Sequence, residues 1–363
     1  MQANLASMAL DVTSRSALVD AARTSSLAGA TIVGFEAHGI DLSNADLSRS
    51  TWFEVELDGA KLDGAQLFGA CLDGVSLRGA SMRGVDASGA SLRGARLDGC
   101  DLTQCDLSDA VLEGAHLTAA TLDRAVLLNV DLTDVIAGEV DFSKARVSSS
   151  KLGEADLHGA RFFLADFTAA DLTSARVAGA TFRQSLFIEA KCDKVDFRAC
   201  VLELSNFSSA SMAAANLSDA RAKQICLNRA DLSNAILTRF AAQRADLHGA
   251  KLDGAVLSEC DFREASFDGA TAQRASFRGG TLSEARFPKA NLRAAAFEGA
   301  ELSLVDFSHA NLEQASLVDA TLDGANLHRA KMDGAQTSGA SMRGCRKTDG
   351  NRAKAEDYGG AAK

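Results

Sequence analysis

Histidine and cysteine are the residues of this chain whose side chains could act as nucleophiles, general bases or metal ligands. The sequence contains six His and eight Cys. No His forms a plausible nucleophile pair with a Cys or Ser, and no two Cys have the C-x-x-C spacing of a zinc site. The sequence therefore predicts no catalytic residues, no cofactor and no metal site.

A repeat of five residues shows how these side chains are positioned. From residue 42 to residue 342, every fifth residue is a "centre", at positions whose numbers end in 2 or 7, and 47 of the 61 centres are Leu or Phe. The residue two places before each centre, the small inward position, is Ala in 41 of 61 cases. None of these positions holds Asp, Glu, Lys or Arg, although 24% of the chain is charged. Because an unpaired buried charge is strongly unfavourable, both positions must face a dry interior.

The remaining three positions of each unit face water. All six His, at 38, 116, 158, 248, 309 and 328, occupy these outward positions. Five Cys take the small inward position, Cys192 is a centre, and Cys71 and Cys226 point outward. We therefore interpret the inward thiols as small core residues in a reducing compartment.

A period of five is neither the 3.6 of a helix nor the 2 of a strand, and it fits a short extended piece followed by a corner. Nine successive Gly, from Gly59 to Gly99, stand two residues after a centre. A type II turn needs a positive φ at its third residue, which Gly adopts readily. The glycines therefore predict a turn after every centre.

Units such as ADLSR, ACLDG and ANLHR resemble the A(D/N)LXX repeat of the pentapeptide-repeat family. The resemblance covers residues 27–345 and implies an all-β fold, a right-handed quadrilateral β-helix of about 16 coils with four units per coil, stacked at β spacing. In this family Asp or Asn before the centre has a local turn role. Residues 1–26 leave the register and are predicted to form an N-terminal cap, with Ser14 or Ser16 capping a short helix that carries Leu18, Val19 and Ala22.

Residues 346–363 are polar and rich in small residues, so we expect a disordered tail. Many members of the family dimerise through an apolar C-terminal helix, which this sequence does not show. A homodimer through an end of the rod stays open.

A partner-binding surface is predicted where large apolar residues occupy outward positions. The candidates fall on adjoining faces of two to three coils, and a contiguous apolar patch usually marks an interface. They are Phe163, Leu164, Leu186, Ile188, Val201 and Leu204. Local packing of irregular turns is the alternative explanation.

A second candidate is a column of acidic residues twenty residues, or multiples of twenty, apart. Some pentapeptide-repeat proteins mimic DNA and bind the type II topoisomerases gyrase and topoisomerase IV, so a continuous acidic stripe would imply that role. Lys and Arg interrupt the acidic rows here. The column consists of Asp46, Asp86, Asp106, Asp166, Asp246 and Asp306.

Composition narrows the partners. The net charge of −10 argues against direct nucleic-acid binding, which needs a basic surface. No stretch approaches 18 apolar residues and no signal peptide is evident, which predicts a cytoplasmic protein without membrane contact. Three functions stay open: a non-catalytic rigid protein-binding scaffold, associated with a component of a bacterial secretion system; a DNA mimic that protects or inhibits a type II topoisomerase; and a bacterial effector exported by a non-classical route.

Overall fold

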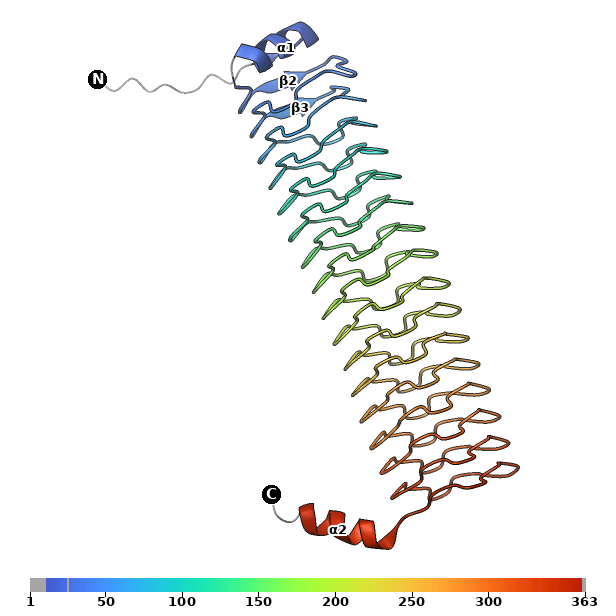
Figure 1. The fold of residues 1–363 in the computed structure, drawn as a ribbon. Coiled ribbons are helices and arrows are strands. Elements are labelled where there is room, and N and C mark those ends of the chain that lie inside the picture. The colour runs from blue at the N-terminus through green and yellow to red at the C-terminus, as the bar shows by residue number, and fades with distance from the viewer. Residues whose placement is uncertain (1–10, 25, 361–363) are drawn as a thin grey trace. The chain divides into compact units, whose positions relative to one another are not determined.

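The computed structural model describes residues 11–24 and 26–360. The chain divides into two compact units, unit 1 (Met1–Thr181) and unit 2 (Phe182–Lys363). Each unit is a right-handed β-helix in which four-sided coils stack on one another (Figure 1). This is the fold that the five-residue repeat predicts.

Successive coils of each unit pair in parallel with a constant step of twenty residues. In unit 1, Asp41 pairs with Lys61, and in unit 2, Lys251 pairs with Thr271. At the N-terminal end the pairing is extensive enough to form three short parallel strands in the order β1-β2-β3: β1 (Asp11–Val12), β2 (Thr31–Val33) and β3 (Thr51–Phe53). Four pentapeptide units therefore complete one coil.

The backbone hydrogen bonds show why each unit turns a corner. The amide of Leu62 donates to the Ser81 carbonyl one coil on (2.7 Å), and the amide of Lys61 donates to the Ile40 carbonyl one coil back (2.8 Å). The amide of Ala65 closes the turn on the Leu62 carbonyl (2.8 Å). The ladder and the turn together satisfy most of the polar backbone, as a buried main chain requires.

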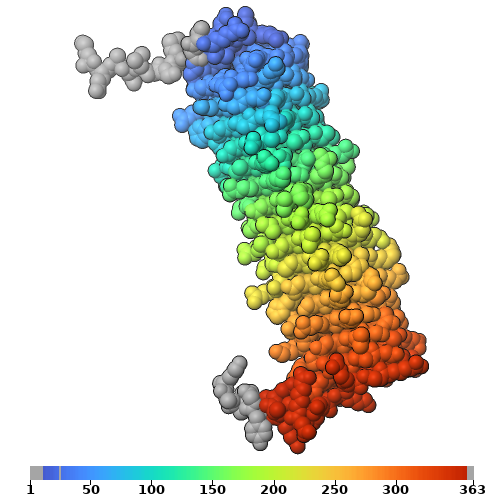
Figure 2. Space-filling view, viewed as in Figure 1, coloured from blue at the N-terminus to red at the C-terminus, as the bar shows by residue number. Residues whose placement is uncertain are grey.

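The interior is filled by the centres, which are almost completely buried from Leu42 to Leu327. Aromatic centres stack between coils: Phe142 on Phe162 in unit 1 (ring centroids 5.5 Å apart) and Phe267 on Phe287 in unit 2 (4.4 Å). Aromatic ladders thus form within each unit. In the space-filling view, the side chains of neighbouring coils within each unit touch one another (Figure 2).

Helix α1 (Arg15–Thr24) belongs to the first described coil. Ser14 caps it, because its hydroxyl accepts the Ala17 amide (3.3 Å) and its carbonyl accepts the Leu18 amide (3.0 Å). Leu18 of this helix is fully buried. Asp11 of β1 pairs with Thr31, so the twenty-residue step already begins before the helix, which replaces two pentapeptide units of that coil. Residues 1–10 of the predicted cap lie outside the described residues.

Helix α2 (Gly350–Gly360) corrects the prediction of a disordered tail. Its N-terminus is capped by Asp349, whose carboxylate accepts the amides of Asn351 (2.9 Å) and Arg352 (3.1 Å). Disorder was predicted because residues 346–363 show no apolar helix face. That prediction is wrong, since α2 is held by a cap and by ionic contacts. Among the described residues, no helix is both long and apolar enough to cross a membrane.

Candidate protein interface on the outer faces of the coils

The outer faces carry nearly all side chains that a partner could reach. Among the described residues, most hollows are shallow grooves between neighbouring coils, lined by polar and charged side chains such as Lys223, Arg244 and Glu264. Another, at the C-terminal end of unit 2, is lined mainly by apolar residues such as Leu327 and Met332. Such grooves do not bring catalytic groups together in a dry cleft, as most active sites do. The arrangement suits contact with another macromolecule.

The cysteines behave as core residues. Cys100 is buried and its thiol donates a hydrogen bond to the Leu77 carbonyl (2.8 Å). Burial raises the pKa of this thiol to about 12, and burial also raises the pKa of Cys105 and Cys260. Cys100 and Cys105 form no disulfide. Because the thiolate is the reactive form, these thiols are poor nucleophiles at neutral pH.

One histidine departs from the prediction that all six face solvent. His328 occupies an outward position of the repeat but is only 2% exposed, because α2 covers it. Its Nδ1 accepts the Asp349 amide (3.2 Å) and its Nε2 lies 3.2 Å from Glu356. The five-residue pattern could not predict this burial, since the covering segment lies outside the repeat.

The six apolar candidates fall in two units. Phe163 and Leu164 belong to unit 1, where they are 38% and 46% exposed. The other four belong to unit 2, where Leu186 and Leu204 are 39% and 44% exposed. Ile188 and Val201 of unit 2 are partly buried. The outward orientation is thus confirmed, and a single patch formed by all six stays a prediction.

Leu164, Leu204 and Leu304 share an unusual backbone conformation. They occupy the turn position two residues after a centre, with φ angles of 56°, 60° and 60°. Among the described residues, forty non-glycine residues have positive φ, and of these only Leu164, Leu204 and Leu304 have large apolar side chains. A non-glycine residue in the left-handed region costs roughly 1 kcal/mol, and exposure of Leu adds a further cost. Leu at these positions therefore favours neither the turn nor the core.

Several exposed apolar residues were missed by the sequence analysis. Phe53 is 53% exposed and Phe68 is 45% exposed, with the Arg49 guanidinium 5.8 Å from the Phe68 ring centroid. Leu304 is 59% exposed. All three hold outward positions, so the same rule would have found them. In unit 2, Ile236 and Val256 pair on adjacent coils and are also exposed.

The acidic column has a local backbone role. In each of its six members, one carboxylate oxygen accepts the amide two residues later, at distances of 2.9–3.2 Å. Each carboxylate thus satisfies a backbone amide that the hydrogen-bond ladder between coils does not. In unit 1 only Asp86 and Asp106 follow each other directly, and the column is interrupted by Gln66, Val126 and Arg146. The predicted turn role is confirmed, and the column forms no continuous acidic stripe in either unit.

Many acidic side chains are paired with basic ones on the next coil. Arg161 contacts Asp141 (3.0 Å) in unit 1, and Arg239 contacts Asp219 (2.6 Å) in unit 2. The hydrogen bond from Arg239 lowers the pKa of the Asp219 carboxyl and raises that of the guanidinium. These pairs neutralise charge along the coils, so the outer surface is a mosaic of both signs.

Comparison with known proteins agrees with this architecture. The model of pentapeptide repeats matches overlapping stretches between residues 40 and 344, except for 204–214 and 240–242. Among functionally curated proteins, no sequence matches this chain.

Three solved structures illustrate the similarity. HetL, a pentapeptide repeat protein involved in heterocyst differentiation regulation in the cyanobacterium Nostoc, is 26% identical over 69% of this chain and 90% of its own (TM-score 0.24). A pentapeptide repeat protein of the Arabidopsis thaliana thylakoid lumen is 31% identical over 26% of this chain and 65% of its own (TM-score 0.25). QnrB1, a plasmid-mediated fluoroquinolone resistance protein, is 16% identical over 59% of this chain and 95% of its own (TM-score 0.22).

Proposed function

We propose that this chain, which belongs to the pentapeptide-repeat family, is a non-catalytic protein that binds another protein through the outer faces of its coils. The observation that carries the proposal is the set of exposed Leu side chains at left-handed turn positions. Leu204, at φ 60° and 44% exposed, is the clearest case near the other unit 2 candidates. Strain and apolar exposure without a gain in folding are typical of binding sites.

The position of Leu204 relative to its neighbours supports this reading. Leu186 pairs with Asn206 on the next coil, two residues after Leu204. Leu186 and Leu204 therefore flank one corner of the same two coils, and both are exposed. Burial of two such side chains against a partner would contribute about 1.5–3 kcal/mol each. We propose the corner that carries Leu186 and Leu204 as the centre of the interface in unit 2, and Phe163 with Leu164 as the corresponding contact in unit 1.

The charge pattern gives less support to a DNA-mimic role. A mimic needs regularly spaced negative charge, because phosphate groups dominate the binding of proteins to DNA. Here the carboxylates of the acidic column accept backbone amides, and basic side chains on the next coil pair with many of the others. A mosaic surface of this kind suits a partner that is read by shape and apolar contact.

Affinity capture from a lysate of the source cell tests the proposal. The wild-type chain would be compared with Phe163→Asp and with Leu204→Asp. Matched controls are Ser143→Asp and Gln224→Asp, each at the same face position one coil away. Circular dichroism would verify that all variants are folded.

We expect quantitative mass spectrometry to find a protein that is recovered with the wild type and both controls. Its recovery should fall at least about tenfold with Leu204→Asp, which corresponds to 1.4 kcal/mol of binding free energy. Equal recovery with the wild type, Phe163→Asp and Leu204→Asp would contradict the proposed interface. Capture of a type II topoisomerase that all variants retain would favour the acidic surface instead.

A further inference from the structure

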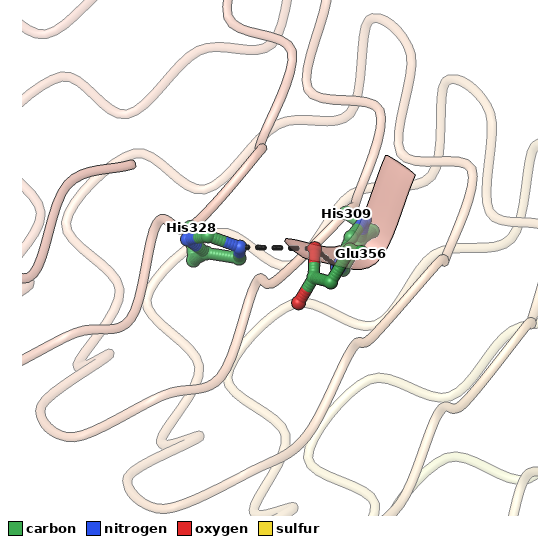
Figure 3. A group of neighbouring side chains, drawn as sticks. All are labelled: His309, His328 and Glu356. Carbon is green, nitrogen blue, oxygen red and sulfur yellow. Dashed lines mark hydrogen bonds and ion pairs between the residues drawn. The ribbon is translucent and has the colours of Figure 1, made fainter. Parts of the chain in front are cut away.

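Two imidazoles and one carboxylate meet where α2 lies against the last coils of unit 2. The Nε2 atoms of His309 and His328 lie 3.4 Å and 3.2 Å from the same Oε2 atom of Glu356 (Figure 3). The three potential ligand atoms all lie within 4.8 Å of one another. None of them contributes to the exposed apolar surface proposed above, so the two sites are independent.

The β-helix fixes two of the three side chains. His309 and His328 stand on neighbouring coils, joined by the hydrogen bond from the His309 amide to the His328 carbonyl (2.8 Å). Their rings lie 5.5 Å apart in an edge-to-face arrangement. The His328 side chain is only 3% exposed, while that of His309 is 32% exposed. The pair is therefore rigid on one side and open to water on the other.

Two of the three separations are close to those of a tetrahedral metal ion. Zinc binds imidazole nitrogen and carboxylate oxygen at about 2.0–2.2 Å, which places neighbouring ligands of a tetrahedron about 3.3–3.5 Å apart. The observed 3.2 Å and 3.4 Å lie close to that range. Two imidazoles with one carboxylate suit zinc and related transition metals, whereas magnesium and calcium prefer oxygen ligands alone.

A further hydrogen bond orients the Glu356 carboxylate. Its second oxygen, Oε1, accepts a hydrogen bond from Arg352 Nε (2.9 Å) one turn earlier on α2. Ligating carboxylates are commonly oriented by such outer contacts. Oε2 therefore remains directed at the two imidazoles.

Two contacts of the cluster must change when a metal binds: that of the Asp349 amide with His328 Nδ1 and that of Arg329 with Glu356 Oε2. His328 Nδ1 accepts a hydrogen bond from the Asp349 amide. The ring proton is therefore on Nε2, which donates a hydrogen bond to Glu356. With a metal at Nε2 the ring proton would reside on Nδ1, so the Asp349 amide would have to give up its hydrogen bond to the ring. Arg329, whose NH1 atom lies 3.6 Å from Oε2, keeps its shorter contact with Asp357 (2.6 Å). A single hydrogen bond to an exposed amide contributes much less free energy than coordination of a transition metal.

We propose that His309, His328 and Glu356 form a zinc site that fastens α2 to the end of unit 2. A water molecule on the exposed side of His309 completes the coordination. Such an ion would compensate for what α2 lacks, since the helix has no apolar face and its described side chains reach the coils through ionic groups. We assign the ion a structural role, since it would join Glu356 of α2 to two histidines of the coils.

Isothermal titration of the full chain with zinc chloride tests the site, with magnesium chloride as the reference ion. The variants are His309→Ala and Glu356→Gln, which avoid the buried His328. The matched control is His38→Ala, because His38 lies 3.6 Å and 3.3 Å from Glu36 and Glu56 in an exposed cluster of the same residue types. We expect one zinc ion per chain to bind more than about 100-fold more weakly to His309→Ala, with no change for His38→Ala.

The overturning result is equally direct. Zinc affinity that is unchanged in both His309→Ala and Glu356→Gln would refute the site, as would a wild-type chain that binds no zinc. X-ray absorption at the zinc edge should show nitrogen and oxygen ligands, and sulfur ligands would place the ion on a cysteine instead.

A second readout follows α2 itself. Zinc should slow tryptic cleavage after Lys354 at least about tenfold in the wild type and leave the cleavage rate of His309→Ala unchanged, since cleavage requires local opening. Equal protection of both proteins by zinc would show that the ion does not act through His309 and would overturn the proposal.

Discussion

Two stretches of unit 1 reach the same backbone with different turn residues. From Gly59 to Gly99, nine successive turns have Gly at the left-handed position, with φ between 59° and 70°. From Ala119 to Glu154, eight successive turns have no Gly there, and φ lies between 56° and 60°. The second stretch includes Arg124, Glu139 and Lys144. The difference teaches that Gly facilitates the turn but does not determine it.

The features that the two stretches share show what determines the turn. Leu92 in the first and Leu122 in the second are both buried, and each amide donates to the next coil at 2.7 Å. A non-glycine turn residue costs roughly 1 kcal/mol, which is less than the contribution of one buried Leu. The interior and the ladder therefore impose the turn on whichever residue occupies it. Four changes should break or sharpen this comparison.

The largest effect should come from a charge in the interior. Leu92→Asp and Leu122→Asp should each lower the free energy of unfolding by more than about 5 kcal/mol, because the carboxylate has no buried partner. The loss should be similar in both stretches if the core dominates. Denaturation followed by circular dichroism measures it, with Ser91→Asp and Thr121→Asp as controls at the neighbouring outward positions. A much smaller loss in the glycine-rich stretch would contradict the argument.

The next largest effect should come from an aromatic centre within the second stretch. Phe142 stacks on Phe162 and meets Phe167 edge to face at 6.0 Å. Phe142→Ala should lower the free energy of unfolding by about 3–5 kcal/mol, through lost burial and a cavity that the rigid coils cannot close. Phe142→Leu, which restores the commonest centre, should recover more than half of the loss. No recovery would mean that ring stacking, rather than volume, stabilises these coils.

The fold was predictable because the same pattern of buried and exposed positions recurs every five residues. The exclusion of charge from centres such as Leu97 and from small positions such as Ala95 identified the interior without any long-range information. The ends were less predictable because they lack the repeat. Ser14 gave a local cap signal, which was correct, whereas α2 has only an Asp349 cap and helix-forming residues without an apolar face.

The candidate interface was predictable in its orientation but not in its extent. The register alone places Phe163 and Leu204 outside. It does not show that Leu204 has a strained backbone, nor that the Asp106 carboxylate is engaged by the Ser108 amide. Those facts depend on φ angles and on the contacts that each coil makes with the next.

A reciprocal exchange at the turns should have an intermediate effect. Gly94 has no atom within 4 Å of the site where a Cβ would stand, so Gly94→Ala tests conformation alone. It should lower the free energy of unfolding by about 1 kcal/mol, and Ala119→Gly should raise it by up to about 1 kcal/mol. Thermal unfolding of the single and double variants measures both. Changes in the free energy of unfolding that have opposite signs and cancel in the double variant would confirm that the turns of both stretches require the same left-handed conformation. A lower free energy of unfolding in Ala119→Gly would contradict it.

The smallest effect concerns acid sensitivity in the second stretch. Burial of Asp141 opposes ionisation, but hydrogen bonds from Ser143 and Arg161 outweigh it, so its pKa lies below the ordinary value. A carboxyl whose pKa is lowered by folding stabilises the fold above its unfolded pKa, and that contribution is lost as the pH falls through the folded pKa. Since an exposed ion pair contributes about 0.2–1 kcal/mol, amide hydrogen exchange around Phe142 should quicken only modestly between pH 5 and pH 3, after correction for intrinsic rates.

The matched variant for this test is Asp141→Asn, which keeps an acceptor for the Ser143 amide but cannot ionise. Its exchange should be slightly faster than that of the wild type at neutral pH, because the ion pair with Arg161 is lost, and it should show less acid dependence. Equal acid dependence in the two proteins would show that the charge on Asp141 contributes nothing and that its hydrogen bond to the turn is its whole role. In that case the ion pairs between coils would matter for the surface that a partner meets rather than for folding, and the ladder and the buried centres alone would hold the two stretches in their common backbone.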